Sequence, residues 1–295
     1  MIDFEHVYKT YETHNDENVA LEDINIHIDE GEFVFILGHS GAGKSTFLKL
    51  IQMEEKPTEG KVFINGQDLT RIKRRKVPYL RRQMGVVFQD FRLIPTMTVY
   101  ENVAFAMRVT NISTKKIKDR VPFALSLVGL EDKMDRLPDE LSGGEQLRVA
   151  VARALAHGPK LIIADECISA LDVSIQAQVV NLMKDIQQET GTAYLFIAHD
   201  LSMVKYISDR IGVLHLGHLL ETGTTEEIFE HPIHPYTRSL LSAIPLPNPV
   251  VEKRRVAETY DYATSGIDYS KGTSHHVEGS HYVKCTDEEF AKWCK

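Results

Sequence analysis

The sequence predicts an α/β fold with a mainly parallel sheet, organised around a loop that binds phosphate groups. Strand-like apolar runs alternate with helix-like stretches, and one strand-loop-helix segment carries a glycine-rich phosphate-binding motif. A long amphipathic stretch over residues 173–189 closes at Gly191, as a helix with a glycine C-cap does. The strand-like runs are residues 33–37, 61–65, 84–88, 160–165 and 193–198.

The composition is that of an ordinary globular protein of one or two domains, with 43% hydrophobic and 26% charged residues among 295. No apolar run approaches the ~18–20 residues of a membrane span, and the N-terminus lacks signal-peptide features, so we expect the chain to stay in the cytoplasm. A formal net charge of −8 argues against general nucleic-acid binding. The scattered cysteines predict free thiols: Cys167, Cys285 and Cys294.

Residues 38–45 read Gly-His-Ser-Gly-Ala-Gly-Lys-Ser and match the pattern G-x-x-x-x-G-K-[ST] between a predicted strand and a predicted helix. The glycines allow successive backbone N–H groups to converge on phosphate oxygens at the helix N-terminus. Lys44 is expected to reach the β and γ phosphates, and Ser45 to offer its hydroxyl to Mg²⁺. The predicted nucleotide-binding residues of this loop are Gly38, His39, Ser40, Gly41, Ala42, Gly43, Lys44, Ser45 and Thr46.

Polar residues follow three further predicted strands. Asp165 can hold Mg²⁺ through water, and Glu166 beside it can orient and polarise the attacking water. Gln89 can reach the metal or the water, and His199 can hydrogen-bond a γ phosphate. Because ligands of open α/β sheets bind at the carboxyl ends of strands, these four side chains are predicted to serve one site. The alternative is an exposed acidic pair with a surface glutamine and a surface histidine.

A second glycine motif, Leu-Ser-Gly-Gly-Glu at residues 141–145, opens a predicted helix. Ser142, Gly143 and Gly144 offer a hydroxyl, N–H groups and the positive end of a helix dipole, which together suit an anion. The alternative is a capping box formed by Ser142 and Glu145. One γ phosphate does not need two such motifs from one subunit. The pair therefore predicts a head-to-tail dimer, in which each nucleotide lies between the phosphate loop of one subunit and the second motif of the other.

Together these motifs resemble the ATP-binding-cassette (ABC) ATPases over at least residues 1–225. The resemblance implies a P-loop NTPase fold and Mg²⁺-dependent hydrolysis of ATP. The implied catalytic residues are Lys44, Gln89, Glu166 and His199. The implied metal ligands are Ser45, Gln89 and Asp165.

The resemblance assigns two further contacts to the nucleotide. Tyr11 matches the aromatic residue that stacks on adenine, with Tyr8 as its rival, and Asp172 lies in the D-loop. Leu147 departs from the family pattern, since this position of the signature helix is usually polar. It either weakens the dimer interface or packs into it.

The chain is predicted to consist of an ABC ATP-binding domain over residues 1–225 and a small accessory module over residues 226–295. A helical subdomain over about residues 92–140 is inserted into the first domain, because this interval is helical in pattern and has no convincing strand. Pro122 and Pro138 punctuate it. From residue 250 onward we expect a loosely packed or partly disordered tail.

The two halves of the chain resemble different branches of the family. Residues 1 to about 146 resemble the cell-division ATPases of the FtsE type, for example in the segment 81–93. Residues from about 147 to 295 resemble the oligopeptide-permease ATPases of the OppF type, for example in the segment 234–236. This pattern suggests a chimera joined near residues 141–150.

The resemblance implies an ATP-hydrolysing subunit at the cytoplasmic face of the cell membrane, without nucleic acid. Its transmembrane partners would be FtsX-like or oligopeptide-permease-like, and it would pair with itself or with a second ABC ATPase. The alternatives are a soluble ATP-driven switch and a hybrid whose halves do not couple. A basic stretch at residues 71–76 either touches anionic lipid or an acidic partner, or is a solvated face. Five histidines could bind a transition metal or be ordinary turn residues: His231, His234, His275, His276 and His281.

Overall fold

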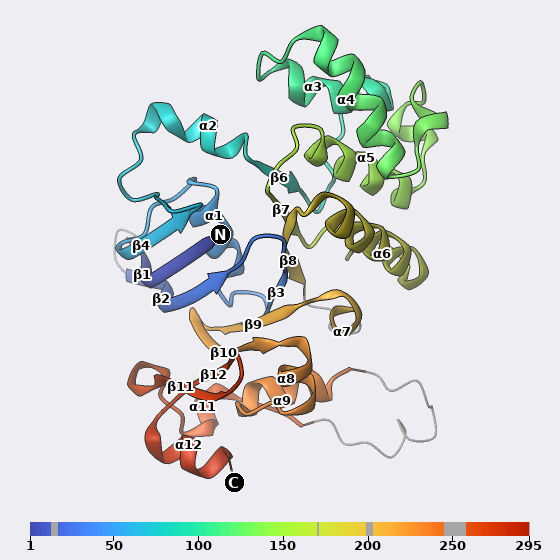
Figure 1. Ribbon diagram of the computed structural model, residues 1–295. Coiled ribbons are helices and arrows are strands. Elements are labelled where there is room, and N and C mark those ends of the chain that lie inside the picture. The colour runs from blue at the N-terminus through green and yellow to red at the C-terminus, as the bar shows by residue number, and fades with distance from the viewer. Residues whose placement is uncertain (13–16, 170, 199–202, 245–257, 295) are drawn as a thin grey trace, which may run out of the picture. The chain divides into compact units, whose positions relative to one another are not determined.

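The computed structural model describes residues 1–12, 17–169, 171–198, 203–244 and 258–294, and it has the predicted α/β fold (Figure 1). The predicted site residue His199 lies outside these ranges. The chain forms two compact units. The first unit comprises Met1, Ile28–Phe33 and Arg71–Ile197, and the second comprises Ile2–His27, Val34–Thr70 and Ala198–Lys295.

The first unit contains three neighbouring parallel strands, β6, β7 and β8. They span Met84–Val87, Leu161–Asp165 and Ala193–Ala198. The apolar residues of β7 are fully buried, as expected for parallel strands covered on both faces. Because the strands run in the same direction, the residues that follow β6 and β7 leave the sheet at one edge.

Helices α3, α4 and α5 of the first unit pack against one another (Figure 1). The helical pattern of residues 92–140 is confirmed, since no strand occurs there. Pro122 lies inside α4 and does not end it, whereas Pro138 opens a short 3-10 helix. Gly191 caps α6 in the left-handed conformation, with a φ of 67°, as predicted. The α-helices of this unit are α2 (Val77–Arg81), α3 (Val99–Arg108), α4 (Thr114–Leu127), α5 (Gly143–Leu155) and α6 (Val173–Thr190).

The second unit contains a four-stranded sheet, in which β4 runs antiparallel to β1 and β5, and a group of strands around β3. The first has the order β2-β1-β4-β5, with strands Glu17–Ile28, Ile2–Glu12, Glu59–Ile64 and Gln67–Asp68. The second has the order β11-β12-β10-β9-β3, with strands Thr273–Glu278, His281–Cys285, His218–Thr224, Arg210–His215 and Phe33–Leu37. Strand β3 runs parallel to β9, and helix α1 (Lys44–Ile51) follows it after the phosphate loop.

The expectation of a loosely packed tail is wrong for residues 258–294. Strand β12 pairs with β10, and Ile233, Val283 and Cys285 form a small core with Phe290 and Trp293. We call residues 218–244 and 258–294 the C-terminal module. Helix α7 (Val204–Ile207) precedes this module. The helices within the module are α8 (Thr225–Glu230), α9 (Pro235–Ser242), α11 (Tyr262–Ser265) and α12 (Asp287–Trp293). Among the described residues, every helix is too short or too polar to cross a membrane.

Candidate functional site

The phosphate loop connects β3 to α1, as the motif predicts, and encloses Lys44. This side chain is only 6% exposed. Its Nζ donates hydrogen bonds to the backbone carbonyl oxygens of Gly38, at 2.7 Å, and His39, at 3.0 Å. These carbonyls compensate the buried positive charge. The ammonium group is therefore already held at the centre of the loop.

Close backbone contacts explain why the loop needs glycine. A Cβ atom on Gly38 would lie 2.2 Å from the carbonyl oxygen of Leu214 on β9. Gly43 has a φ of 106°, and a Cβ there would lie 2.6 Å from the carbonyl oxygen of Ala20. The N–H of Gly217, in the turn between β9 and β10, donates to the carbonyl of Ala42 at 3.0 Å. The loop is thus packed against two neighbouring segments of its own unit.

The first turn of α1 is suited to an anion. Gly43 at its N-cap makes no side-chain capping bond, and the first turn contains no acidic residue. The N-terminal amides and the helix dipole therefore favour a negative group there. For Mg²⁺, the sequence offers the hydroxyl of Ser45 and the side-chain oxygens of Gln89 and Asp165. Such hard oxygen donors fit Mg²⁺, whereas no nitrogen or sulfur ligand is required.

The strand-end residues of the first unit lie at the predicted edge. Asp165 is half-buried and pairs in register with Ile197 of β8. Glu166 is half-buried with a φ of 47°, and its N–H donates to the carbonyl of Ile197 at 3.1 Å. Its own carbonyl accepts from the hydroxyl of Ser169 at 2.8 Å. Gln89 is exposed two residues beyond β6. A left-handed backbone at a residue with a side chain is strained, and such strain is common at functional positions.

The second glycine motif opens α5, and Ser142 caps that helix. The Ser142 hydroxyl donates to Oε2 of Glu145 at 2.8 Å, and the two residues form a complete capping box. Hydrogen bonds from Lys133 and then from Ser142 lower the pKa of Glu145 to about 2. Gly144 is buried, and a Cβ there would lie 2.6 Å from Cγ2 of Ile175. Ser142 and Gly143 are exposed, so the capping role leaves both available to a further ligand.

The remaining predicted positions are placed as follows. The ring of Tyr11, near the end of β1, has the Lys9 ammonium 4.8 Å from its centroid. Tyr8 is half-buried, and burial with nearby carboxylates raises its pKa. Asp172 is exposed at the N-cap of α6. Leu147 is fully buried, so its side chain packs inside its own subunit.

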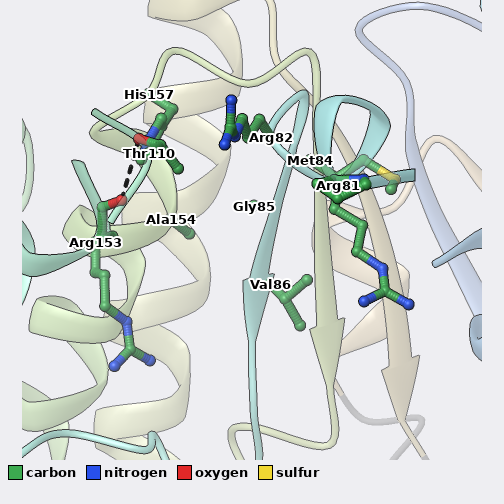
Figure 2. A pocket seen from close by; sticks show the side chains of 11 residues that line it. Arg81, Arg82, Met84, Gly85, Val86, Thr110, Arg153, Ala154 and His157 are labelled. Carbon is green, nitrogen blue, oxygen red and sulfur yellow. Dashed lines mark hydrogen bonds between the residues drawn. The ribbon is translucent and has the colours of Figure 1, made fainter. Parts of the chain in front are cut away.

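A pocket of about 420 Å³ lies in the first unit, between β6, α3 and α5 (Figure 2). Three arginines give it a positive character, namely Arg81, Arg82 and Arg153. Thr110 and His157 hydrogen-bond across it at 2.8 Å. Burial and neighbouring cations lower the pKa of His157, which keeps the imidazole neutral.

Three exposed apolar residues adjoin lining residues of this pocket in the sequence. Phe105 on α3 and Val109 directly after α3 are 39% and 58% exposed, and Tyr79 on α2 is 63% exposed. We call the pocket together with Tyr79, Phe105 and Val109 the arginine-lined hollow. The residues of the basic stretch at 73–76 are also exposed.

Sequence reasoning missed two residues that hold predicted segments in place. Arg153 donates from both terminal nitrogens to the carbonyls of Phe91 and Arg92, each at 2.5 Å, just after Gln89. Tyr236 contacts His39 of the phosphate loop. Neither contact leaves a local sequence signal, because each joins residues more than 60 positions apart. Within the described ranges, no three His, Cys, Asp or Glu side chains gather closely enough to hold a metal ion.

These features define a P-loop nucleotide-binding protein. A glycine-rich loop with a buried lysine connects a strand to a helix, and the parallel strand β7 ends in an aspartate, Asp165. Residues 21–169 match the family model described as ABC transporter, and residues 220–266 match that described as Oligopeptide/dipeptide transporter, C-terminal region. The chain belongs to the ABC transporter ATP-binding family. It is accordingly an ATPase of the ABC type, with ATP and Mg²⁺ as its cofactors.

Relatives match the chain over almost its whole length. The chain is 45% identical to the oligopeptide transport ATP-binding protein OppF of Bacillus subtilis, over 98% of this chain and 97% of that protein. It is also 45% identical to the dipeptide transport ATP-binding protein DppF of Lactococcus lactis, over 92% of this chain and 89% of that protein. These alignments cross the predicted junction near residues 141–150. They give no support to an FtsE-like half or to a chimera.

A solved structure of the dimeric ATP-binding cassette MJ0796, bound to ADP and Pi in a post-hydrolysis state, has the same fold. It superposes with a TM-score of 0.68 at 35% identity, over 76% of this chain and 99% of that one. The α/β ABC nucleotide-binding fold predicted from the sequence is confirmed.

Proposed function

We propose that this chain is the ATP-hydrolysing subunit of an importer for oligopeptides or dipeptides. The observation that carries the proposal is the C-terminal module, residues 220–266 of which resemble the C-terminal region of peptide transporters. Its strand β10 pairs with β9, so the module continues the run of strands that supports the phosphate loop. OppF and DppF, which are named for peptide transport, align through this module as well as through the ATP-binding part.

For the domains, we propose an ATP-binding domain over residues 1–225 and a peptide-transporter module over residues 226–295. In the ATP site, Lys44 and His199 would contact the γ phosphate and Glu166 would accept a proton from the attacking water. Ser45, Gln89 and Asp165 would hold Mg²⁺, which neutralises charge on the phosphates when bound. Tyr11 would stack on the adenine.

We propose that two ATPase subunits bind head to tail, with Ser142, Gly144 and Asp172 facing the nucleotide held by the other subunit. The exposure of Ser142 at the N-terminus of α5 supports this arrangement. The MJ0796 structure is described as dimeric and carries ADP and Pi. The partner ATPase is either a second copy or a related chain.

The arginine-lined hollow is our proposed contact for a transmembrane permease at the cytoplasmic face of the membrane (Figure 2). Its three arginines and the exposed apolar residues next to its lining in the sequence suit an amphipathic segment that carries acidic residues. The first unit supplies the hollow and also Gln89, which follows β6. Movement of the permease would therefore reach the ATP site through β6 and the segment after it.

A photo-crosslinking residue at Phe91 or Leu93, which follow β6, tests the partner. In membranes of the source cells, crosslinks to a peptide permease are expected. The matched control places the crosslinker at Tyr206, which is 79% exposed in the second unit. Capture of an FtsX-like division protein would contradict peptide import. A protein that stays wholly soluble and gives no membrane crosslink would instead indicate an ATP-driven switch.

A further inference from the structure

One side chain of the C-terminal module contacts the phosphate loop. Tyr236 on α9 is 2% exposed, and its hydroxyl accepts a hydrogen bond from the backbone N–H of His39 at 3.2 Å. The same hydroxyl lies 2.7 Å from Nδ1 of the His39 ring. A single hydroxyl group thus bonds both the backbone and the side chain of the second residue of the loop.

The protonation of Tyr236 fits both hydrogen bonds. Burial raises the pKa of its hydroxyl to about 12, so the group keeps its proton near neutral pH. The hydroxyl can therefore donate to Nδ1 of His39 while it accepts from the His39 N–H. This arrangement requires the neutral His39 ring to carry its proton on Nε2.

The ring of Tyr236 is itself fixed by its neighbours. His215, at the end of β9, stacks on it with ring centroids 4.0 Å apart, and Tyr260 meets it edge-on at 5.6 Å. Nδ1 of His215 lies 2.8 Å from the hydroxyl of Tyr269, which lies 2.8 Å from that of Tyr260. Displacing Tyr236 from the loop would disrupt this stacked and hydrogen-bonded cluster.

We propose that Tyr236 is a positioning residue for nucleotide binding, because it holds His39 and thereby the phosphate loop in the conformation that receives the phosphates. The inference rests on the proposed function in that it takes this loop to be the ATP site. A loop that is ordered beforehand loses less conformational entropy when the nucleotide binds. The C-terminal module therefore strengthens ATP binding by the same unit, in addition to any role in peptide transport.

The substitution Tyr236→Phe tests this role because it removes the hydroxyl and keeps the ring. We expect the Kd for the non-hydrolysable analogue AMP-PNP with Mg²⁺, measured by calorimetry, to rise at least about fivefold, because the substitution removes both hydrogen bonds between the hydroxyl and His39. The KM for ATP should rise similarly, while kcat changes less than about twofold. Tyr260→Phe is the matched control, since it removes a hydroxyl from the same cluster that does not touch the loop. Its Kd should stay within about twofold of the wild type.

The positioning role would be overturned if Tyr236→Phe bound AMP-PNP as tightly as the wild type, or more tightly. It would also be overturned if Tyr236→Phe and Tyr260→Phe lost affinity for AMP-PNP to the same extent. A wild-type protein that does not bind AMP-PNP would overturn the proposed function instead. A second measurement needs no variant and remains decisive if Tyr236→Phe does not fold. The imidazole nitrogen NMR spectrum of the wild type in mildly alkaline buffer should show His39 protonated on Nε2. A proton on Nδ1 would contradict the proposed hydrogen bond.

Discussion

The ammonium group of Lys44 donates a hydrogen bond to the carbonyl oxygen of Gly38, six residues earlier in the chain, at 2.7 Å. The side chain thereby closes the phosphate loop on itself and is only 6% exposed. In the proposed ATP site, phosphate oxygens are stronger acceptors for this ammonium group than backbone carbonyl oxygens, because they are charged.

Lys44→Ala should remove the proposed contact between the ammonium group and the phosphates. We expect ATPase activity to fall by about 100-fold or more, as in other sites that lose a charged group that stabilises a transition state. Lys49→Ala, on the exposed face of the same helix, is the matched control and should keep wild-type activity. Phosphate release measured for both purified variants checks the prediction. Comparable activity in the two variants would remove Lys44 from the site.

Glu145 should make stability depend on pH in a defined range. Its pKa falls from the ordinary value of 4.5 to about 2 in the folded protein, chiefly through its bond with Lys133. Its contribution is therefore complete above pH 4.5 and is lost as the pH falls toward 2. Glu145→Gln should lower the urea midpoint of unfolding near pH 6, and the gap to the wild type should narrow below about pH 4. A gap of constant size would contradict this account.

Arg153 should control the mobility of the segment after Gln89. Phe91 and Arg92 both have left-handed backbone angles, with φ of 56° and 47°, and the Arg153 fork bonds both of their carbonyls. Arg153→Lys keeps the charge but cannot reach both oxygens. Amide hydrogen exchange over residues 90–93 should therefore accelerate by about tenfold. Arg148→Lys, on the same helix, should leave it unchanged. Unaltered exchange in Arg153→Lys would show that other contacts hold the segment.

Glu221 should be essential for the packing of the C-terminal module. It is 1% exposed and accepts hydrogen bonds from the backbone N–H groups of Ile233 and His234 and from the fully buried His281 ring, at 2.7–3.0 Å. Glu221→Gln replaces one carboxylate oxygen, which accepts hydrogen bonds, by an NH2 group, which donates them. It should lower the free energy of unfolding by about 3 kcal/mol. Glu226→Gln, an exposed neighbour, should cost less than about 0.5 kcal/mol. Urea titrations compare the two, and equal small effects would refute the prediction.

The phosphate loop and its flanking elements could be predicted because their signals are local. The strand before Gly38, the glycines and the helix from Lys44 all lie within one short segment. The packing of residues 258–294 could not be predicted, because these residues are held by contacts with residues far away in the sequence. His281 bonds Glu221 across 60 positions, and Tyr236 bonds His39 across 197.

Short segments also misled the prediction of the branch of the family. The segment 81–93 and the segment 234–236 resemble different ABC ATPases when each is considered alone. Alignment over the whole chain weighs all positions together, and OppF of Bacillus subtilis matches continuously across both. The motifs at Lys44 and Ser142 constrain the chemistry, whereas partner choice depends on surfaces that no short motif describes.

Two ATPase subunits, either two copies of this chain or two related chains, are proposed to share each ATP, and Glu166 is proposed to activate the water. The variant Glu166→Gln, examined with ATP and Mg²⁺ by light scattering and by ATPase assays, separates these roles from a structural one. We expect turnover to fall by about 100-fold or more and a stable ATP-dependent dimer to form, with twice the 33.4 kDa mass of the chain when both subunits are copies of it. A variant with unchanged turnover, or one that stays monomeric with ATP in the presence of its partner ATPase, would contradict these proposals.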